Sequence, residues 1–508
     1  MSLRGSGESS VDRALGGNTS SPANFLLREC SIMRENLGGQ ELGNQKLDIK
    51  NFVSEISIDE SIYNNAINVD IRIMDNSKLY SSLRLNGAEK IRLVIARNQD
   101  SKLELFNLEL VISDLDLFTQ VNNDMQSYVL KCVPEYTLIN QTKTISDSFT
   151  DIVEAIKSIC HGDLKIPNIK LDGPLKREIE SASLRGILDR RQRGPLGLGK
   201  TTKEINEKKL PAQPAKGIYP LMKPLSVINW LVRNISNNST PYYFYQTSNG
   251  MVKLRSYQEM LDNENSFNEN KPYSNVDTIA YYSVQDTMKD SEKDFYEMEK
   301  FKILKINQPS NLSTIKNISN GTYASNKHSI DIYKKEYIDD DDFEYSGMKT
   351  LNSSKPFSDS VKFGEKKLLD NKTSKNYFIN LNSGAFDDNN LGNYHSIIND
   401  TIQKKEAYFN VIDSQIQEII INGDFLIESG QTINLEILQN LSTDKKLKDE
   451  EIDTPDKMLS GIYLVTALRH SFENQKFTTR LKVKRDSFDL DMNEPDKVFK
   501  ENTFTKDG

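Results

Sequence analysis

The chain has 508 residues, which at about 150 residues per domain suggests three domains and a sizeable core. Its 65 Lys and Arg residues against 73 Asp and Glu residues give a net charge of −8, which excludes the basic surface of a general nucleic-acid or anionic-membrane binder. Three cysteines cannot form a disulfide framework and indicate a reducing compartment. Neither a signal peptide nor an apolar stretch of membrane-spanning length is found, so we expect a soluble protein made in the cytoplasm.

The first part of the chain predicts an arm followed by a β domain. Residues 1–23 are almost free of apolar side chains and predict a disordered arm. Residues 24–140 predict a first β domain, because apolar residues alternate with polar ones, most clearly in 67–73. Turn-forming residues at 75–77 separate the expected strands.

Residues 141–262 predict a smaller α+β domain. Residues 151–154 form a capping box for one helix, and Pro224 is a suitable first residue for a second. Ser248-Asn249-Gly250 lies between two strand-like runs and predicts a hairpin. Within this domain, residues 185–216 carry nine Lys and Arg residues against three acidic ones and predict an exposed, mobile basic loop.

The remainder predicts a second β domain. Residues 263–404 are rich in Asn, Asp, Ser and Lys, and predict one strand of that domain plus a loop-rich insert. Residues 405–490 predict the second β domain, and residues 491–508 a C-terminal tail. A strand, a glycine before an Ile-x-Leu run and a closing strand pair follow one another in both β domains. We interpret this order as a duplicated domain.

One segment matches a nucleotide-binding motif. Residues 194–201, Gly-Pro-Leu-Gly-Leu-Gly-Lys-Thr, fit the phosphate-loop pattern G-x-x-x-x-G-K-[ST]. Such a loop needs an apolar strand before it and a helix after it, so that backbone N–H groups converge on the phosphates. Here the preceding segment is strongly charged, the following one has no apolar stripe, and Pro195 removes an N–H. We interpret the match as a chance one, with an ATP-using assembly or packaging factor as the alternative function.

The other chemistry-bearing residues do not predict an enzyme, a cofactor or a metal site. The four histidines lack the pairing that zinc ligation needs. Cys160 and His161 are helix neighbours that point apart, which predicts a buried thiol beside a surface imidazole. The acidic run 339–342 lacks the spacing of a calcium loop and predicts a solvated loop. We expect His470 to bond locally at a strand end and half of the 242–245 aromatics to face a core.

Three blocks of sequence carry a family resemblance. The first runs from Phe52 through Val69-Asp-Ile-Arg-Ile-Met-Asp75 to Leu93, and the second covers Ile218–Leu231 and Phe244–Ser256. The third covers Ser460–Phe472 and Leu481–Ser487. Together they resemble, in order, the central baseplate hub proteins of contractile-tailed phages, whose fold also occurs at the base of type VI secretion spikes. They span most of residues 47–487.

The resemblance implies a mainly β fold with two tube-like antiparallel β-barrel domains plus smaller α+β and loop-rich domains. It implies a homotrimer whose six barrels form a pseudo-sixfold ring joining a hexameric tail tube to a trimeric central spike. The partners would be tail tube or tube-initiator proteins, the central spike and baseplate wedge proteins. The protein would be non-catalytic, without cofactor, metal or membrane anchor, assembled in the host cytoplasm and located in the virion tail baseplate. The structural residues of the family motifs are Gly87, Pro224, Trp230, Gly250, Gly461, Arg469 and His470.

The ring would also surround the path of phage DNA, which passes without sequence-specific binding. Residues 47–140 contain nine Lys and Arg residues against fourteen Asp and Glu residues, a balance of −5. A basic wall would hold DNA by neutralising phosphates and releasing counterions. We therefore expect an acidic or neutral channel wall.

Overall fold

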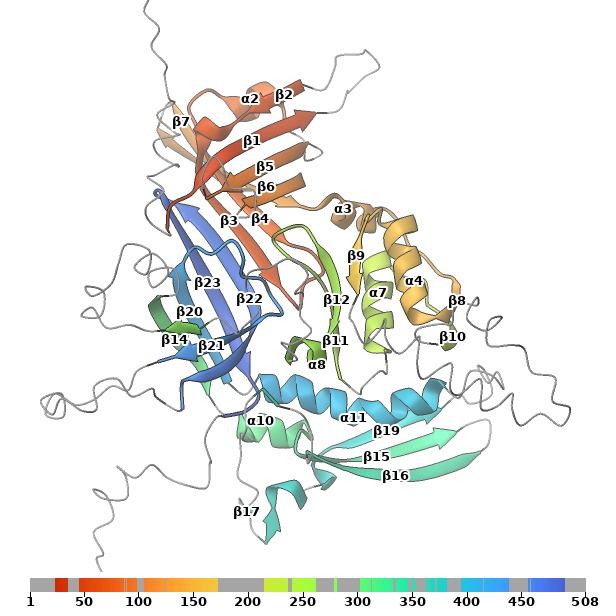
Figure 1. The fold of residues 1–508 in the computed structure, drawn as a ribbon. Coiled ribbons are helices and arrows are strands. Elements are labelled where there is room, and N and C mark those ends of the chain that lie inside the picture. The colour runs from red at the N-terminus through yellow and green to blue at the C-terminus, as the bar shows by residue number, and fades with distance from the viewer. Residues whose placement is uncertain are drawn as a thin grey trace, which may run out of the picture.

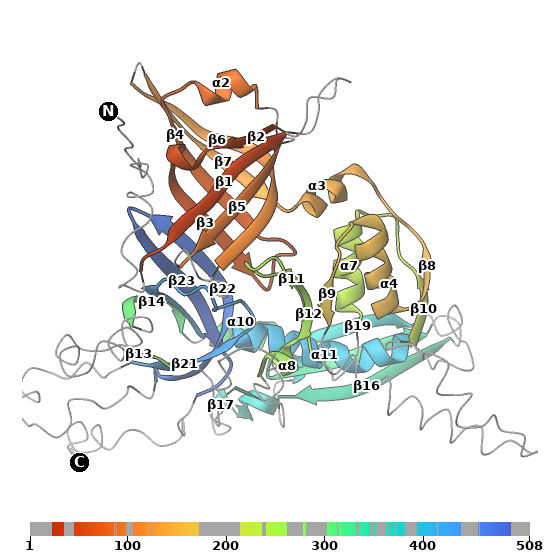
Figure 2. The same ribbon diagram turned by 45° about the horizontal axis from the view of Figure 1, so that its top comes forward.

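A computed structural model shows a chain dominated by one large sheet that is antiparallel except where β13 pairs with β21 (Figures 1 and 2). The predicted arm except Ala23, the phosphate-loop match at 194–201, most of the basic loop and the tail 491–508 lie outside the described residues. The structure describes residues 23–34, 45–85, 87, 89–97, 105–122, 124–171, 214–235, 240–261, 278–280, 302–311, 313–331, 335–345, 350–351, 362–363, 365–370, 372–381, 394–413, 415–437, 456 and 458–488.

Thirteen strands form this sheet, which we call the shared sheet. They are β1 (Leu26–Arg34), β2 (Gln45–Asp48), β3 (Val53–Ser61), β4 (Asn68–Asp75), β5 (Lys90–Ala96), β6 (Leu105–Asn122), β7 (Met125–Val133), β13 (Thr278–Ala280), β14 (Ile303–Asn311), β20 (Gln415–Asn422), β21 (Thr432–Glu436), β22 (Gly461–Glu473) and β23 (Lys476–Arg485). Their order is β14-β20-β23-β22-β3-β4-β7-β6-β5-β1-β2, with β21 and β13 joined to β22. Two short helices, η1 (Lys50–Phe52) and α2 (Leu79–Leu83), interrupt the first half.

The two halves of the shared sheet have the same strand order. The first β unit runs β3-β4-β7-β6-β5 and the second β unit runs β14-β20-β23-β22-β21, with antiparallel neighbours throughout. Both units carry a β-bulge at the same place. The Ser113 hydroxyl of β6 donates to the carbonyl of Lys131 at 3.0 Å, and the Thr466 hydroxyl of β22 donates to the carbonyl of Lys482 at 3.1 Å. The duplication predicted from the sequence is therefore confirmed.

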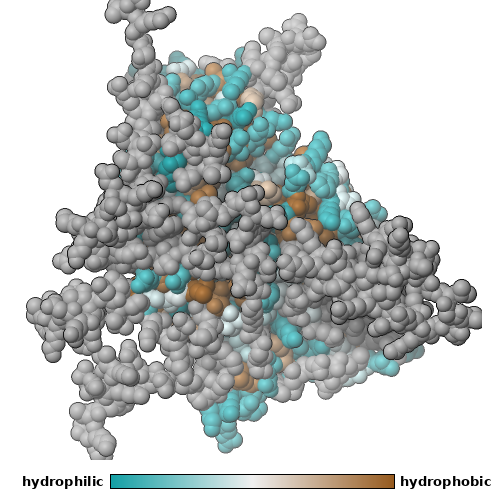
Figure 3. Space-filling view, in the orientation of Figure 1, coloured by the Kyte–Doolittle hydropathy of each residue, from teal (hydrophilic) through white to brown (hydrophobic). Residues whose placement is uncertain are grey.

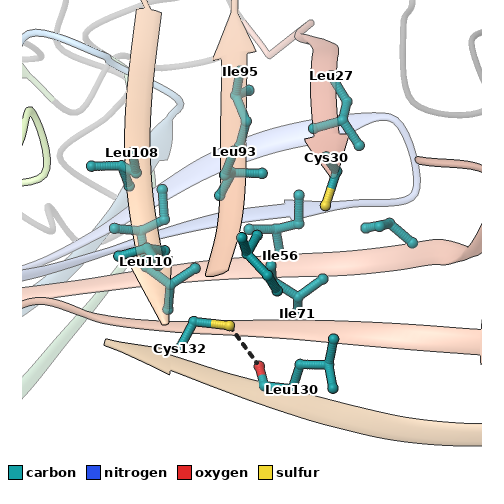
Figure 4. Close-up of a cluster of buried hydrophobic side chains, with 14 of the residues drawn as sticks. Leu27, Cys30, Ile56, Ile71, Leu93, Ile95, Leu108, Leu110, Leu130 and Cys132 are labelled. Atoms are coloured by element: carbon teal, nitrogen blue, oxygen red, sulfur yellow. Dashed lines mark hydrogen bonds between the residues drawn. The ribbon is translucent and has the colours of Figure 1, made fainter. Parts of the chain in front are cut away.

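Each β unit has its own apolar core, filled by the alternate residues that the sequence pattern identified. Figure 4 shows the first core, where side chains from six strands meet and the Cys132 thiol lies 3.7 Å from the carbonyl oxygen of Leu130. Two antiparallel β units together with smaller α+β parts confirm the predicted fold class. The units are nevertheless fused into one sheet, because β22 pairs with β3.

The α+β unit packs beside the sheet (Figure 1). Its capping box is present, since the Asp151 carboxylate accepts the backbone N–H of Glu154 at 2.7 Å, and its second helix begins at Pro224 as predicted. Strand β10 already begins at Pro214, so the last residues of the predicted basic loop are strand instead. The elements are α3 (Glu135–Thr142), β8 (Ser148–Asp151), α4 (Ile152–Ser158), η2 (Ile159–Asp163), β9 (Ile169–Leu171), β10 (Pro214–Ile218), α7 (Pro224–Arg233), β11 (Tyr242–Gln246), β12 (Val252–Ser256) and α8 (Tyr257–Leu261).

The predicted loop-rich insert is more regular than its composition suggested. A three-stranded sheet, β16-β15-β19, is covered by a long helix. The acidic run 339–342 lies in a strand of this sheet, so the predicted solvated loop is wrong. The helix was missed in the sequence, and in the part of it whose side chains are described an apolar face lies at Ala407, Tyr408 and Val411. The elements are α10 (Thr314–Ser319), β15 (Ala324–Asp331), β16 (Glu336–Glu344), β17 (Lys362–Phe363), β18 (Lys366–Lys367), η6 (Leu368–Asp370), η7 (Lys372–Ser374), β19 (Asn376–Leu381) and α11 (Tyr394–Ile412).

Candidate functional site at the joint between the two β units

The two β units are joined by a seven-pair antiparallel ladder between β22 and β3. Arg469 lies opposite Asp59 in this ladder, and its Nε and Nη2 donate to the two carboxylate oxygens at 2.5 and 2.6 Å. Such a bidentate pair has a defined geometry, but it is partly exposed and therefore adds little stability. The pair favours the observed register of the joint.

An aromatic cluster fills the core side of the joint. Phe472 and Phe477 of the second β unit stack with ring centroids 4.3 Å apart and pack into the first core. The rings of Phe106 and Phe425 lie 4.9 Å apart in the same cluster, and the Arg97 guanidinium lies 5.1 Å from the Phe425 centroid. Separating the units would expose these large rings to water, so the joint is built to stay closed.

His470 is buried inside the joint. It lies well inside β22, so its predicted position at a strand end is wrong, whereas the predicted local hydrogen bond is present, with Nδ1 3.0 Å from the Thr479 hydroxyl. Burial lowers the pKa of His470 to about 3. The ring is therefore neutral at pH 7, packed against Phe106 and Phe477, and poorly suited to act as a general base.

Glu60 connects three parts of the chain. Its side chain leaves β3 on the core side and is 2% exposed. One carboxylate oxygen accepts the backbone N–H of Ser248 in the β11–β12 turn, and the other accepts that of Ser429 between β20 and β21, both at 2.5 Å. Burial and the neighbouring Glu428 raise the pKa of Glu60 to about 7, against the opposing effect of these two N–H donors.

Two buried cations complete this three-way junction. Lys253 Nζ lies 2.6 Å from a Glu428 carboxylate oxygen, and both side chains are almost fully buried. Arg255 donates to the carbonyl oxygen of Gly430 at 2.9 Å. Gly430 has φ +81°, and a Cβ there would lie 2.3 Å from the Tyr245 hydroxyl oxygen, so only glycine fits this approach. Both cations come from β12, and both partners belong to the second β unit.

The opposite face of the shared sheet is polar and close to neutral. A cleft of about 400 Å³ opens on it, lined in part by Asp59, Arg469 and Arg480. Where Figure 3 shows described surface, it is largely hydrophilic with separate apolar patches. Charged side chains point to this face from seven strands: β20, β23, β22, β3, β4, β7 and the adjoining part of β6. Those that are at least partly exposed are seven acids (Glu55, Asp59, Asp70, Asp114, Asp116, Glu418, Glu473) and six bases (Arg72, Lys131, Arg469, Lys476, Arg480, Lys482).

The structure brings together only two of the seven predicted motif residues, Arg469 and His470. Gly87 and Gly250 have φ of +84° and +83° in turns, where glycine is favoured, and Gly461 begins β22. Pro224 and Trp230 belong to α7, where Trp230 packs against the core of the α+β unit.

The sequence analysis missed the three-way junction. Glu60 is in phase with Ile56 and Ile58 on β3, so the alternation itself places this carboxylate on the core side. Alternation could not single out Lys253 and Arg255, because every residue of β11 and β12 is buried, whichever face of the strand it is on. For the same reason, the prediction that only half of the 242–245 aromatics face a core was wrong.

The sequence analysis also considered Cys160, His161, metal ligands and membrane-spanning segments. Cys160 is buried and His161 exposed, as predicted. No group of three or more His, Cys, Asp and Glu side chains among the described residues is arranged to hold a metal ion. None of the helices described has both the length and the apolar character to cross a bilayer.

The chain is similar in structure to several known proteins. No protein-family model and no curated protein matches the chain. Among solved structures, it is similar to a tail protein from Neisseria meningitidis MC58 (9% identity, 91% of this chain and 97% of that chain, TM-score 0.47). It is also similar to the 43 kDa tail protein of prophage MuSo2 from Shewanella oneidensis (9% identity, 91% and 100%, TM-score 0.44).

A third likeness is to an E. coli protein described as a type VI secretion component with structural similarity to bacteriophage T4 tail proteins (8% identity, 85% and 73%, TM-score 0.39). Tail and type VI secretion proteins are the groups that the sequence blocks resemble.

Proposed function

We propose that this protein is the structural hub of a contractile phage tail baseplate. It acts as a trimeric adaptor between a hexameric tail tube and a trimeric central spike, and forms part of the DNA channel. The observation that carries the proposal is the duplication: two β units with the same strand order and the same bulge lie side by side in one sheet. Three copies supply six such units, which match a sixfold tube on one side and a threefold spike on the other.

The polar face of the shared sheet suits the wall of a DNA channel. Its seven acids and six bases leave no excess of positive charge to hold the phosphate backbone. Several of these charges are also paired within the face, as in Arg72 with Glu55 at 2.9 Å and Lys131 with Asp116 at 2.6 Å. A wall of this kind lets hydrated DNA pass, and it calls for no catalytic residue.

The test is the mass of the assembled particle and the potential along its axis. We expect native mass spectrometry of the purified hub, or of hub released from baseplates, to give three times 57.9 kDa. We expect a cryo-EM map of the baseplate to show the polar face lining the channel. A protein that is monomeric alone and forms no ring in the virion, or a channel lined mainly by Lys and Arg, would refute the proposal.

A further inference from the structure

The cleft on the polar face of the shared sheet lies over the joint, where short side chains stand beside long ones. Most of its lining comes from two adjacent rows of the ladder: Glu418, Lys482, Ala467 and Ser61, then Arg480, Arg469, Asp59 and Asn68. In the first row the side chains of Ala467 and Ser61 are short, whereas most of their neighbours in the two rows are long. The short side chains leave the hollow of about 400 Å³.

Two cations of the cleft lack a partner among the described residues. Arg469 is bound to Asp59, but the side chains of Arg480 and Lys482 make no hydrogen bond or ion pair with any described residue. Arg480 lies directly opposite Arg469 on one side and Ile420 on the other. Like charges opposite each other on a sheet repel, and Lys482 adds a positive charge two positions along the same face of β23. An anion between Arg480 and Lys482 would relieve this repulsion.

The cleft is a positive spot on a face that is otherwise slightly negative. Because Arg469 and Asp59 cancel each other, Arg480 and Lys482 outnumber the single remaining acid on this face of the cleft, Glu418. Of the seven acids and six bases of the polar face, five acids and three bases lie outside the cleft. This charge distribution attracts an anion to the cleft and repels anions from its surroundings, so it favours a ligand with one isolated negative charge.

We propose that this cleft binds a single carboxylate group of a polypeptide, with Arg480 and Lys482 as its cationic ligands. The planar guanidinium of Arg480 can donate two parallel hydrogen bonds to a carboxylate, and Lys482 supplies a point charge. Asn64 and Asn68 line the same cleft and offer amide groups to the peptide backbone beside that carboxylate. The lining residues all belong to one chain, so the site goes beyond the proposed hub role and does not depend on the ring.

A nucleic-acid backbone fits the cleft less well than an acidic side chain does. Each strand of DNA carries one negative charge for about every 3.4 Å along the helix axis. The phosphates on either side of a bound one would face Glu418 or the five acids outside the cleft. An acidic residue between neutral residues of a polypeptide avoids this repulsion. The charge pattern therefore favours a polypeptide carboxylate over DNA.

Saturation-transfer difference NMR on the purified full-length protein tests the site. The method detects ligands that bind in the millimolar range, where a small group held by a few contacts is expected to bind. The probe is a short, capped Gly/Ser peptide with one central Glu, and the matched peptide has Gln in its place. We expect the Glu peptide to bind at least about tenfold more tightly. Equal binding of the two peptides would refute the proposal.

Substitutions show whether the peptide binds in the cleft. Arg480→Gln and Lys482→Gln should each weaken binding of the Glu peptide at least about tenfold, because each removes a charge-assisted contact. Ala467→Leu keeps every charge but fills the hollow, and should also weaken binding. Lys476→Gln removes an exposed lysine of the same strand outside the cleft, so it is the matched control and should leave binding unchanged. Circular dichroism checks that each variant is folded. Undiminished binding by folded Arg480→Gln and Lys482→Gln would overturn the assignment.

A short oligothymidylate is the probe for the alternative ligand. At physiological salt it should bind more weakly than the Glu peptide. Tighter binding of the oligonucleotide, lost in Lys482→Gln, would make the cleft a phosphate site and refute the carboxylate. A trimer that does not bind the Glu peptide would refute the cleft and leave the proposed function intact. A protein that binds the peptide but forms no ring would refute the proposed function and leave the cleft.

Discussion

Replacing Phe477 by alanine should destabilise both β units together. Phe477 is fully buried, and its ring lies 4.3 Å from that of Phe472 and 4.7 Å from that of Phe425, measured between centroids. The substitution removes the buried ring itself, its contacts with the rings of Phe425, Phe472 and His470, and the atoms that fill the space next to Gly423. Buried Phe→Ala changes lower the free energy of unfolding by about 3–5 kcal/mol, and we expect a loss in this range.

Urea unfolding at fixed protein concentration measures this loss with two probes. Far-UV circular dichroism reports the sheet, and the fluorescence of Trp230, the single tryptophan, reports the α+β unit. We expect both transitions to move to lower urea and to remain coincident. Phe378→Ala, at a side chain that is 71% exposed, is the control and should change the free energy of unfolding by less than about 0.5 kcal/mol. A two-step circular dichroism transition in the Phe477 variant would show that the two β units unfold independently, against this reasoning.

Three further predictions concern buried groups. The pKa of Glu60 is raised to about 7, so between about pH 4.5 and 7 the native state holds a proton that the unfolded state has released. The contribution of Glu60 to the free energy of unfolding therefore falls as pH rises through this range. In Glu60→Gln, the melting temperature from thermal unfolding should lack this fall. The pKa of His470 is lowered to about 3, so its contribution is lost as pH falls from about 6.5 towards 3, and His470→Gln should flatten that part of the urea-derived stability profile. Gly423→Ala places a Cβ 2.0 Å from the Phe477 ring and should cost about 1–3 kcal/mol in urea unfolding, whereas Gly162→Ala, with nothing within 4 Å, should cost far less.

The sequence predicts the β units well because the alternation of apolar and polar residues that marks a strand is visible within a few neighbouring residues. A half-buried strand shows its exposed and buried faces within a few residues, so alternation in 67–73 was enough to place β4. The helix at Pro224 and the hairpin at Gly250 likewise depend on residues within one turn. Strand pairing, in contrast, depends on distant segments, and the β22–β3 ladder joins residues about 410 positions apart.

The candidate site was harder to predict because its members owe their roles to that pairing. Arg469 was selected through a family resemblance, and its partner Asp59 is visible only once β22 and β3 are aligned. Glu60 lies beside Asp59 in the sequence, yet it faces the opposite side of the strand and meets backbone groups from two other parts of the chain. Helix α11 was missed for a related reason, since much of its stabilisation comes from the sheet it covers.

The two boundaries of the first β unit are held by different physical forces, and this difference decides which of them responds to its surroundings. The boundary with the second β unit combines a seven-pair ladder with stacked aromatic rings, and its buried histidine stays neutral above about pH 3. The boundary with the β11–β12 hairpin instead relies in part on the buried Glu60 carboxylate, and two buried cations of the same hairpin bind the second β unit. Changing the charge of such a group costs far more than changing that of a surface group. As pH falls, the native Glu60 carboxylate at the hairpin boundary therefore takes up its proton near pH 7, whereas the native His470 at the joint stays neutral until about pH 3.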